Sequence, residues 1–354
     1  MTLKTKQSSS KGYFLGLDIG SVSLNTVLLD ENNHILEDHY DYVHGKPFDV
    51  LLERLTSVLK NFPQEQISGS AVTGTGGKLA TGLIGGTFIN EIIAQATSAG
   101  RLFPEARTVI EIGGEDSKLI LLEQDPSNGE SRLVDFEMNS ICAAGTGSFL
   151  DQQARRIGVP IEKEFGEMAL RSVDPPRIAG RCSVFAKSDM IHHQQIATPL
   201  HDIVAGLCFA LARNFRSNLA RSKEIKKPVV FSGGVAANSG MVRAFREVLE
   251  LKDGELIIPE YHASMGAIGA VMHARSTGVE MNNFIGLENL RQYLARDSSP
   301  FISLPPLSQS GAKYSKVVEF RKNGQEKLRE LADLVWGVEA AMLGDVLGHV
   351  RLPT

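Results

Sequence analysis

The feature that most constrains the fold of this 354-residue chain is a pattern that occurs twice. Each copy has a β-strand that ends at an acidic residue, a glycine turn, a second strand, another turn and a third strand. The copies span residues 15–40 and 109–136, and their first strands end at Asp18 and Glu111. Short apolar runs bounded by Gly, Asn and Asp are typical of strands joined by turns. A duplicated unit of this kind predicts an α/β protein with two similar lobes that face each other across a cleft.

Three glycine turns have the composition of phosphate-binding loops. They follow apolar strands at Asp18, at Glu111 and at residues 228–231. Glycine lets the backbone approach phosphate oxygens closely, so that N–H groups and hydroxyls can bind them. One such turn is as consistent with a simple hairpin as with a phosphate site, but three in this order predict a nucleotide held between two lobes. The predicted nucleotide-binding residues are Gly20, Ser21, Ser23, Asn25, Gly113, Gly114, Ser117, Gly145, Thr146, Gly147, Gly233, Gly234, Val235 and Asn238.

Carboxylates beside the first two turns are the candidates for metal binding and hydrolysis. Carboxylate oxygens suit Mg2+, and a carboxylate can orient the water that attacks a phosphate. No GxxxxGK[ST] motif occurs, and no GxGxxG motif opens a strand-turn-helix unit, so a P-loop is excluded and a dinucleotide site is unsupported. Which carboxylate orients the water stays open among the candidate catalytic residues Asp18, Glu111, Glu115 and Asp116.

Two of the three cysteines, Cys142 and Cys182, each stand just before a predicted helix. A helix N-terminus lowers the pKa of a thiol and stabilises an anionic metal–thiolate cluster. Two ligands per chain are too few for a cluster that needs four thiolates, unless a twofold axis brings the same pair from a second copy. From their spacing in the sequence alone, Cys142 and Cys182 are equally well explained as ordinary buried thiols. Cys208 lies among apolar helix residues and is predicted to belong to the core.

Composition limits the location and the partners of the chain. A formal net charge of -4 and a pI near 6.2 give no sign of the clustered positive charge that binds nucleic acid or an anionic membrane. No apolar run approaches the roughly 20 residues that span a bilayer, and the first residues lack the apolar centre of a signal peptide. The chain is therefore expected in the cytoplasm, where its three cysteines stay reduced.

Five segments together resemble the motifs of one known family. LGLDIGSVSLNTVLL resembles its first phosphate motif, VIEIGGEDSKLI its second, and FSGGVAANSGM its adenosine motif. CAAGTGSFLDQQA and RCSVFAKSDMI resemble its two cysteine motifs. The family is that of the BadF/BadG/BcrA/BcrD ATPases, activators of 2-hydroxyacyl-CoA dehydratases and of benzoyl-CoA reductase, within the acetate and sugar kinase, Hsp70 and actin superfamily. The resemblance covers residues 12–275.

The resemblance implies a two-lobed actin-like ATPase of duplicated ribonuclease H-like domains, with ATP and Mg2+ in the cleft between the lobes. It also implies a homodimer with one 4Fe-4S cluster, ligated by Cys142 and Cys182 of both copies. The electron would come from ferredoxin or flavodoxin and pass to a 2-hydroxyacyl-CoA dehydratase-like or benzoyl-CoA reductase-like acceptor. Two alternatives stay open: a small-molecule kinase, such as a sugar kinase, with incidental cysteines, and a nucleotide-sensing module that needs no hydrolysis.

The same resemblance sets the predicted domain boundaries. The first lobe is expected to span residues 12–100 with a return helix at 262–276, and the second lobe, with both cysteines, residues 101–261. A disordered tail at 1–11 and a C-terminal extension of uncertain fold at 277–354 complete the chain. Glu115 and Thr75 depart from the short activators and resemble a longer branch with tandem activator domains. A truncated or diverged tandem form therefore stays open.

Overall fold

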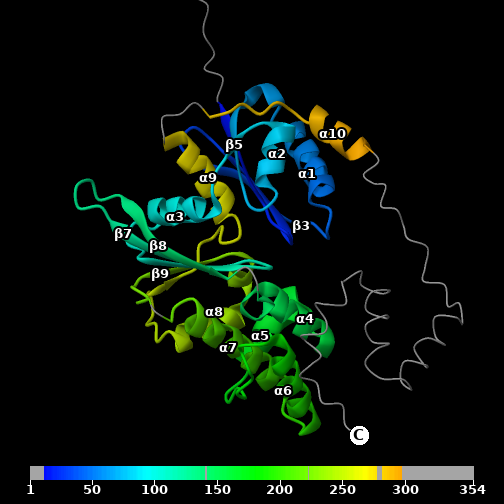
Figure 1. Ribbon diagram of the computed structural model, residues 1–354, viewed down its shortest axis with the longest axis vertical. Helices are drawn as coiled ribbons and strands as arrows, with labels where there is room; N and C mark the ends of the chain where they lie inside the picture. The colour runs from blue at the N-terminus through cyan, green and yellow to red at the C-terminus, as the bar shows by residue number, and fades with distance from the viewer. Residues whose placement is uncertain (1–11, 140–141, 222, 277–280, 297–354) are drawn as a thin grey trace, which may run out of the picture. The chain divides into compact units, whose positions relative to one another are not determined.

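The fold of the chain comes from a computed structural model (Figure 1), which describes residues 12–139, 142–221, 223–276 and 281–296. The chain divides into two units, Met1–Arg296 and Asp297–Thr354, and only the first contains described residues. The tail predicted at 1–11 lies outside the described residues, as does most of the extension predicted at 277–354.

The first repeat forms a five-stranded sheet with the order β3-β2-β1-β4-β5. Its β1–β2–β3 meander is antiparallel, whereas β4 and β5 continue the sheet in parallel. Successive side chains of β1 project to opposite faces of the sheet. Leu15, Leu17 and Ile19 therefore lie in a core cluster on one face, and Asp18 lies on the other face. The strands are β1 (Tyr13–Ile19), β2 (Ser23–Leu29), β3 (Ile35–Tyr42), β4 (Ile67–Thr73) and β5 (Thr87–Phe88).

The second repeat forms a sheet of the same plan, with the order β10-β9-β6-β7-β8. Again three strands form an antiparallel meander, and two strands extend the sheet in parallel on the side of the first strand. The duplicated α/β architecture expected from the repeat is therefore confirmed. The strands are β6 (Thr108–Ile112), β7 (Ser117–Gln124), β8 (Ser131–Asn139), β9 (Val229–Ser232) and β10 (Leu256–Ile257).

Helices connect and cover the two sheets. In α1 the apolar residues Leu51, Leu55 and Val58 recur at helical spacing and are buried, which is why this segment is a helix with one face in the core. No helix among the described residues is long and apolar enough to cross a bilayer. The α-helices are α1 (Pro47–Asn61), α2 (Gly77–Ile84), α3 (Glu91–Leu102), α4 (Gly147–Ile157), α5 (Gly166–Leu170), α6 (Ser183–Gln195), α7 (Leu200–Asn218), α8 (Ser239–Val248), α9 (Met265–Ser276) and α10 (Glu288–Ala295). The short helical turns are η1 (Gln64–Gln66), η2 (Ala143–Gly145), η3 (Ile161–Phe165) and η4 (Gly234–Ala237).

The pair of helices α3 and α9 joins the two repeats. α9 packs on β1 and β4 of the first sheet, α3 packs on β6, β7 and β8 of the second, and the two helices pack on each other (Figure 1). Glycine makes this approach close, because a Cβ added to Gly269 would lie 1.8 Å from the carbonyl oxygen of Ala94. The other face of the second sheet is covered by a separate cluster that includes Phe149 of α4, Leu207 of α7 and Phe245 of α8.

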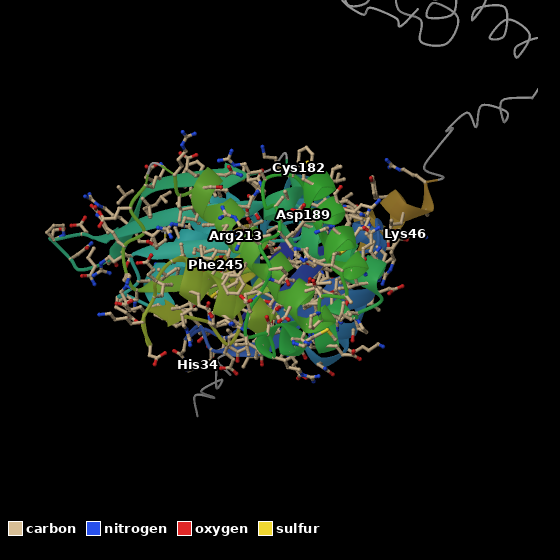
Figure 2. The ribbon with its side chains drawn as sticks, turned by 90° about the horizontal axis from the view of Figure 1, so that it is seen from below. His34, Lys46, Cys182, Asp189, Arg213 and Phe245 are labelled. Atoms are coloured by element: carbon tan, nitrogen blue, oxygen red, sulfur yellow. The ribbon has the colours of Figure 1, made fainter. Side chains whose placement is uncertain are left out.

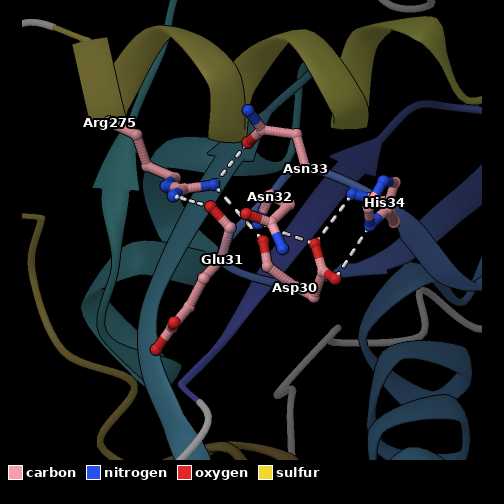
Figure 3. A network of polar contacts seen from close by, with 6 residues as sticks. All are labelled: Asp30, Glu31, Asn32, Asn33, His34 and Arg275. Carbon is pink, nitrogen blue, oxygen red and sulfur yellow. Dashed lines mark hydrogen bonds and ion pairs between the residues drawn. The ribbon is translucent and has the colours of Figure 1, made fainter.

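The end of α9 is fastened to the turn between β2 and β3 (Figure 3). Arg275 donates to the carbonyl oxygens of Asp30 and Glu31 and to the side chain of Asn33. Its guanidinium also lies 4.1 Å from the ring centre of Phe14 on β1, a favourable cation–π distance. These contacts fix α9 along the first sheet, so its other end is held at a defined place beside Asp18.

Residues 281–296 join the first unit of the fold, although the sequence pattern weakens beyond residue 277. Ser70 of β4 donates to the carbonyl of Asn282, and α10 packs on α1 and α2. Phe284 forms a β-bridge with Gly85, and Leu287 and Leu290 are buried in the same cluster as the apolar side of β1. The described part of the predicted extension therefore contributes to the core of the first lobe.

The α3–α9 contact gives a prediction about stability. Gly269→Ala should lower the free energy of unfolding by about 1–3 kcal/mol, because the new methyl group has no space beside α3. Gly82→Ala is the matched control, since Gly82 is a helical glycine and, among the described residues, no atom outside its own helix lies within 4 Å of an added Cβ. That change should instead stabilise by up to about 1 kcal/mol. Urea unfolding measures both values, and equal stabilities would contradict the packing described here.

Candidate nucleotide and metal site

The first part of the site lies at the end of β1. Asp18 pairs with Asn25 of β2 and with Thr73 of β4, and residues paired across neighbouring strands project to the same face. All three side chains are buried, and Asn25 Oδ1 and Thr73 Oγ1 have no hydrogen-bond partner among the described residues. Buried polar atoms are nearly always hydrogen-bonded in proteins, so these two atoms are available to a water molecule or a polar ligand beside Asp18.

The backbone closes tightly around Asp18. A Cβ added to Gly74 would lie 2.5 Å from Oδ1 of Asp18, and one added to Gly266, near the start of α9, would lie 2.3 Å from Oδ2. Only glycine leaves room for the carboxylate at these two positions. The carboxylate is consequently only 8% exposed at the junction of β1, β4 and α9.

The second part of the site is a buried ion cluster around Lys118, which pairs with Glu111 across β6 and β7. Lys118 is fully buried. Its Nζ lies 2.7 Å from Oε2 of Glu111 and 2.8 Å from both Oδ2 of Asp116 and Oε1 of Glu91. Glu91 occupies the first turn of α3, where the helix dipole favours negative charge, and Asn90 caps this helix through the N–H of Ile92.

Burial and mutual repulsion dominate the electrostatics of this cluster. Burial raises the pKa of Asp18 well above its ordinary value, and the charge of Glu91 raises it further. Burial likewise raises the pKa of Glu111 to about 7, because the ion pair with Lys118 offsets only part of this effect and Asp116 adds repulsion. For Lys118, burial lowers the pKa, but the surrounding carboxylates outweigh it and raise the pKa well above its ordinary value. Three carboxyl groups contact one ammonium and Asp18 interacts with them, so the raised pKa values of Asp18 and Glu111 reflect how unfavourable it is to ionise all four carboxyl groups.

The three predicted glycine turns converge at this place. The first two have the same internal hydrogen bond, from Gly20 N to the carbonyl of Ser23 and from Gly113 N to that of Asp116. They also touch, because a Cβ on Gly114 would meet the side chain of Val22 at 2.4 Å. The third turn joins them at Gly233, where φ is +87° and a Cβ would lie 2.8 Å from Oε1 of Glu111.

The remaining predicted residues lie around these turns. Ser21 and Glu115 are exposed, and Glu115 stands outside the ion cluster. Ser117 pairs with Ile112, so its hydroxyl, which has no partner in the described part of the chain, projects to the face of the sheet opposite Glu111. Asn238 caps α8 through the N–H of Met241. Gly145, Thr146, Gly147, Gly234 and Val235 lie on the connections that follow Cys142 and Gly233, and Ser23 and Asn25 lie on β2.

Cys142 is tied to the second glycine turn through the start of α4. Gly147 N donates to the carbonyl of Gly113 at 2.9 Å, and Ser148 donates to the carbonyl of Gly114 through its N–H at 2.8 Å and its hydroxyl at 2.6 Å. Cys142 is exposed and stands five residues before Gly147. A shift of the turn would therefore move the first turn of α4 with it.

The connection before Cys182 is held by side chains from two helices. Asp189 of α6 accepts from the N–H of Ala179 at 2.8 Å, and Arg213 of α7 donates to the carbonyl of Ile178 at 3.0 Å. Asp189, Arg213 and Cys182 are labelled in Figure 2. Cys182 itself is half-buried at the N-cap position of α6. The thiol is thus presented at the start of a helix by a braced loop.

Asn214 of α7 contacts the connections of both cysteines. Its Nδ2 donates to the carbonyl of Gly180, and its Oδ1 would lie 2.8 Å from a Cβ on Gly145. Cys142 is held further by Asn139, which accepts from the N–H of Cys142 and donates to its carbonyl. Cys208 differs from the other two cysteines, because it is fully buried, and burial raises its pKa to about 12. Its predicted place in the core is confirmed.

Sequence reasoning missed Lys118 and Glu91 as members of the site. Lys118 had a detectable signal, because it is a charged residue directly before the apolar run Leu119 to Leu122, near the start of a predicted strand. Glu91 had none, since its part in the cluster depends on how α3 packs between the repeats.

Comparisons with known proteins agree with this arrangement. The model of the BadF/BadG/BcrA/BcrD ATPase family matches residues 15–274. The chain belongs to this family. It is 36% identical over 265 residues to the 2-hydroxyisocaproyl-CoA dehydratase activator of Clostridioides difficile, covering 74% of this chain and 94% of the relative. It is 32% identical over 264 residues to the (R)-2-hydroxyglutaryl-CoA dehydratase activating ATPase of Acidaminococcus fermentans, covering 74% of this chain and 96% of that relative.

Solved structures of family members have the same fold. The Clostridium difficile activator with bound ADPNP matches with a TM-score of 0.65 at 34% identity, over 74% of this chain and 94% of that one. Component A of the Acidaminococcus fermentans (R)-2-hydroxyglutaryl-CoA dehydratase matches with a TM-score of 0.68 at 31% identity, over 75% and 98%. The expected actin-like α/β fold is thereby confirmed.

The raised pKa of Glu111 predicts how stability depends on pH. The folded protein keeps a proton on Glu111 that the unfolded chain releases from its ordinary pKa of 4.5 upward. This contribution to stability is complete below the unfolded pKa and is lost as the pH rises through about 7. The melting temperature without nucleotide and metal should therefore fall over this window, and Glu111→Gln should make the fall smaller. Glu115→Gln, in the exposed part of the same turn, should keep the wild-type slope. Equal slopes for all three proteins would contradict the assignment.

Proposed function

We propose that this protein is an ATP-hydrolysing activator that passes a low-potential electron through a 4Fe-4S cluster shared by two copies to a 2-hydroxyacyl-CoA dehydratase-like enzyme. The observation that carries the proposal is the direct hydrogen bonding between the second glycine turn and the helix that follows Cys142. It connects the candidate phosphate site to a candidate cluster ligand within a few residues.

The nucleotide half of the proposal rests on the fit of the buried groups to a magnesium nucleotide. Asp18 and Glu111 would hold Mg2+ or its water ligands, and Asn25 and Thr73 would supply neutral oxygens that otherwise lack a partner. The backbone N–H groups of the converging turns would bind phosphates. Glu111 is suited to orient the attacking water, because a carboxylate with a pKa near 7 can accept a proton at neutral pH. Glu115 and Asp116 remain candidates for this role.

The cluster half rests on the setting of the two cysteines. Both precede helix N-termini, and neither is buried. Helix N-termini stabilise thiolates, and two thiolates from each of two copies would complete the four that a cluster requires. A 4Fe-4S cluster supplies one-electron transfer at low potential when it is bound. Val184 and Phe185, directly after Cys182, are 64% and 66% exposed, and exposed apolar residues of this size are typical of an interaction surface.

Nucleotide turnover would then act on the cysteines through the chain itself. A change of the phosphates at Gly113 and Gly114 would move their carbonyls, and with them the start of α4 that these carbonyls hold. Asn214 would carry the change to the loop before Cys182, because it contacts both connections. ATP drives such a change only to the extent that it binds one arrangement more tightly than the other.

The relatives support the choice of acceptor. Those named above are activators of dehydratases, and one of the subunits of the benzoyl-CoA reductase from Thauera aromatica is 26% identical over 266 residues. We propose a dehydratase-like acceptor, with a benzoyl-CoA reductase-like acceptor as the alternative, and ferredoxin or flavodoxin as the donor. A sugar kinase with incidental cysteines is the second candidate function. Analysis of iron and acid-labile sulfide in anaerobically purified protein separates the two, because only the activator contains both.

The cluster assignment predicts the effect of each cysteine. Cys142→Ser and Cys182→Ser should each reduce iron from about two atoms per chain to near zero and remove the brown colour. Cys208→Ser is the matched control and should keep the iron, since this thiol lies in the core. Iron analysis with circular dichroism as a check of folding decides the result. Full iron in either of the first two variants would contradict a cluster bridging two copies.

The nucleotide assignment predicts that hydrolysis and cluster binding separate. Asp18→Asn should lower the ATPase rate by about 100-fold or more, because it removes a charged group from the metal and phosphate site. The cluster spectrum should be unchanged, since Asp18 lies on β1 of the first sheet, whereas both cysteine connections follow strands of the second sheet in the chain. Asp125→Asn, in an exposed turn of the second repeat, should change neither property. Loss of both properties in the Asp18 variant would show that Asp18 is needed for folding and not specifically for hydrolysis.

A further inference from the structure

The ammonium group of Lys118 stands where a metal ion would bind. The carboxylate oxygens of Glu91, Glu111 and Asp116 lie within 4.8 Å of one another, close enough to ligate one cation. Nζ of Lys118 lies 2.7–2.8 Å from an oxygen of each. An ammonium has three N–H donors, so these three contacts use all of them. Lys118 therefore fills the centre of the group of three carboxylates.

A second observation also indicates that a cation or a polar ligand binds here. The turn that follows Asp18 touches the turn that contains Asp116, since a Cβ on Gly114 would meet the side chain of Val22 at 2.4 Å. Besides burial, the charges of the three carboxylates also raise the pKa of Asp18. On the same face of its sheet, Asn25 Oδ1 and Thr73 Oγ1 are buried without a partner among the described residues. Hard divalent cations take six or more oxygen ligands, commonly carboxylates together with neutral oxygens. The residues around Asp18 and Glu111 offer both carboxylate and neutral oxygens, but the ammonium of Lys118 lies between the three carboxylates.

We propose that Lys118 is a built-in cation that prevents the carboxylates of Glu91, Glu111 and Asp116 from binding a divalent cation until a nucleotide is present. This regulation rests on the proposed function for the identity of the nucleotide. Phosphates offer the ammonium an alternative partner, and its movement toward them frees the carboxylates for the metal. Metal and nucleotide would then bind with positive coupling, which is reciprocal by linkage.

The contrasting explanation is that Lys118 is only structural. Removing one partner of a buried ion cluster is strongly destabilising, so loss of stability alone would not distinguish the two explanations. They differ in what happens to a divalent cation when no nucleotide is present. A lysine that is only structural is needed to keep the carboxylates together, so its replacement lets them separate and leaves no metal site. Carboxylates beside a built-in cation are positioned by their own strands and helix, so they bind a metal ion when the lysine is replaced.

The test is a titration with Mn2+ in the absence of nucleotide, followed by the electron paramagnetic resonance signal of free Mn2+. Wild-type protein should bind Mn2+ weakly, whereas Lys118→Met should bind one ion per chain at least about tenfold more tightly. Glu91→Gln added to Lys118→Met removes one ligand and should reverse most of this gain. Lys226→Met is the matched control, because Lys226 pairs with Glu123 on the surface, and it should bind as the wild type does.

Folding is monitored by melting in the same buffers, and Lys118→Gln serves as a second variant that keeps a hydrogen-bond donor. Mn2+ should raise the melting temperature of the lysine variants but not that of the wild type. The proposal is overturned if a folded Lys118 variant gains no Mn2+ binding, or if the wild type without nucleotide binds Mn2+ as tightly as the variants. These measurements depend neither on iron nor on ATP hydrolysis. A negative result would therefore refute only the role proposed for Lys118, and the proposed activator function would still be tested separately by the cysteine and Asp18 variants.

Discussion

The buried ammonium of Lys118 is the interaction on which the charge balance of the site depends. Moving charges out of water is costly unless close partners compensate for it, and carboxylates gathered without a cation would repel one another. Lys118 holds together Glu91 from α3, Glu111 from β6 and Asp116 from a glycine turn, so it joins three separate elements. Because α3 also packs on α9, and α9 closes over Asp18, the cluster links the first strands of both repeats.

The glycine turn between β6 and β7 connects this charged interior to the cysteines. Its carbonyls at Gly113 and Gly114 hold the first residues of α4, while the side chain of Asp116 in the same turn bonds Lys118. The residues of this turn therefore contact both the ion cluster and the start of α4, which follows Cys142. Asn214 extends this route to the loop before Cys182. The proposed coupling needs no long path through the core, because one turn takes part in both sites.

The sequence predicted what depends on local pattern and left out what depends on packing. The repeated strand and glycine pattern predicted two sheets of one plan, since alternation and turn residues act within a few positions. It could not place Glu91 beside Lys118, because that contact depends on the rotation of α3 between two repeats. Nor could composition show that Ser117 projects away from Glu111, since strand register decides this. Phe284 was missed because a short apolar segment after a weak pattern joins the core only through tertiary contacts.

The two halves of the proposed function make opposite demands on their surroundings, and the second sheet meets both. Carboxylates that bind phosphate and metal are most effective away from water, whereas thiolates completed by a second copy must reach the surface. Glu111 and Lys118 project to the face of the second sheet that α3 covers. Asn139 pairs with Ser117 and projects to the opposite face, where it holds the backbone of Cys142. Because neighbouring positions on a strand alternate between faces, a shift of β6 or β7 must act on both environments at once.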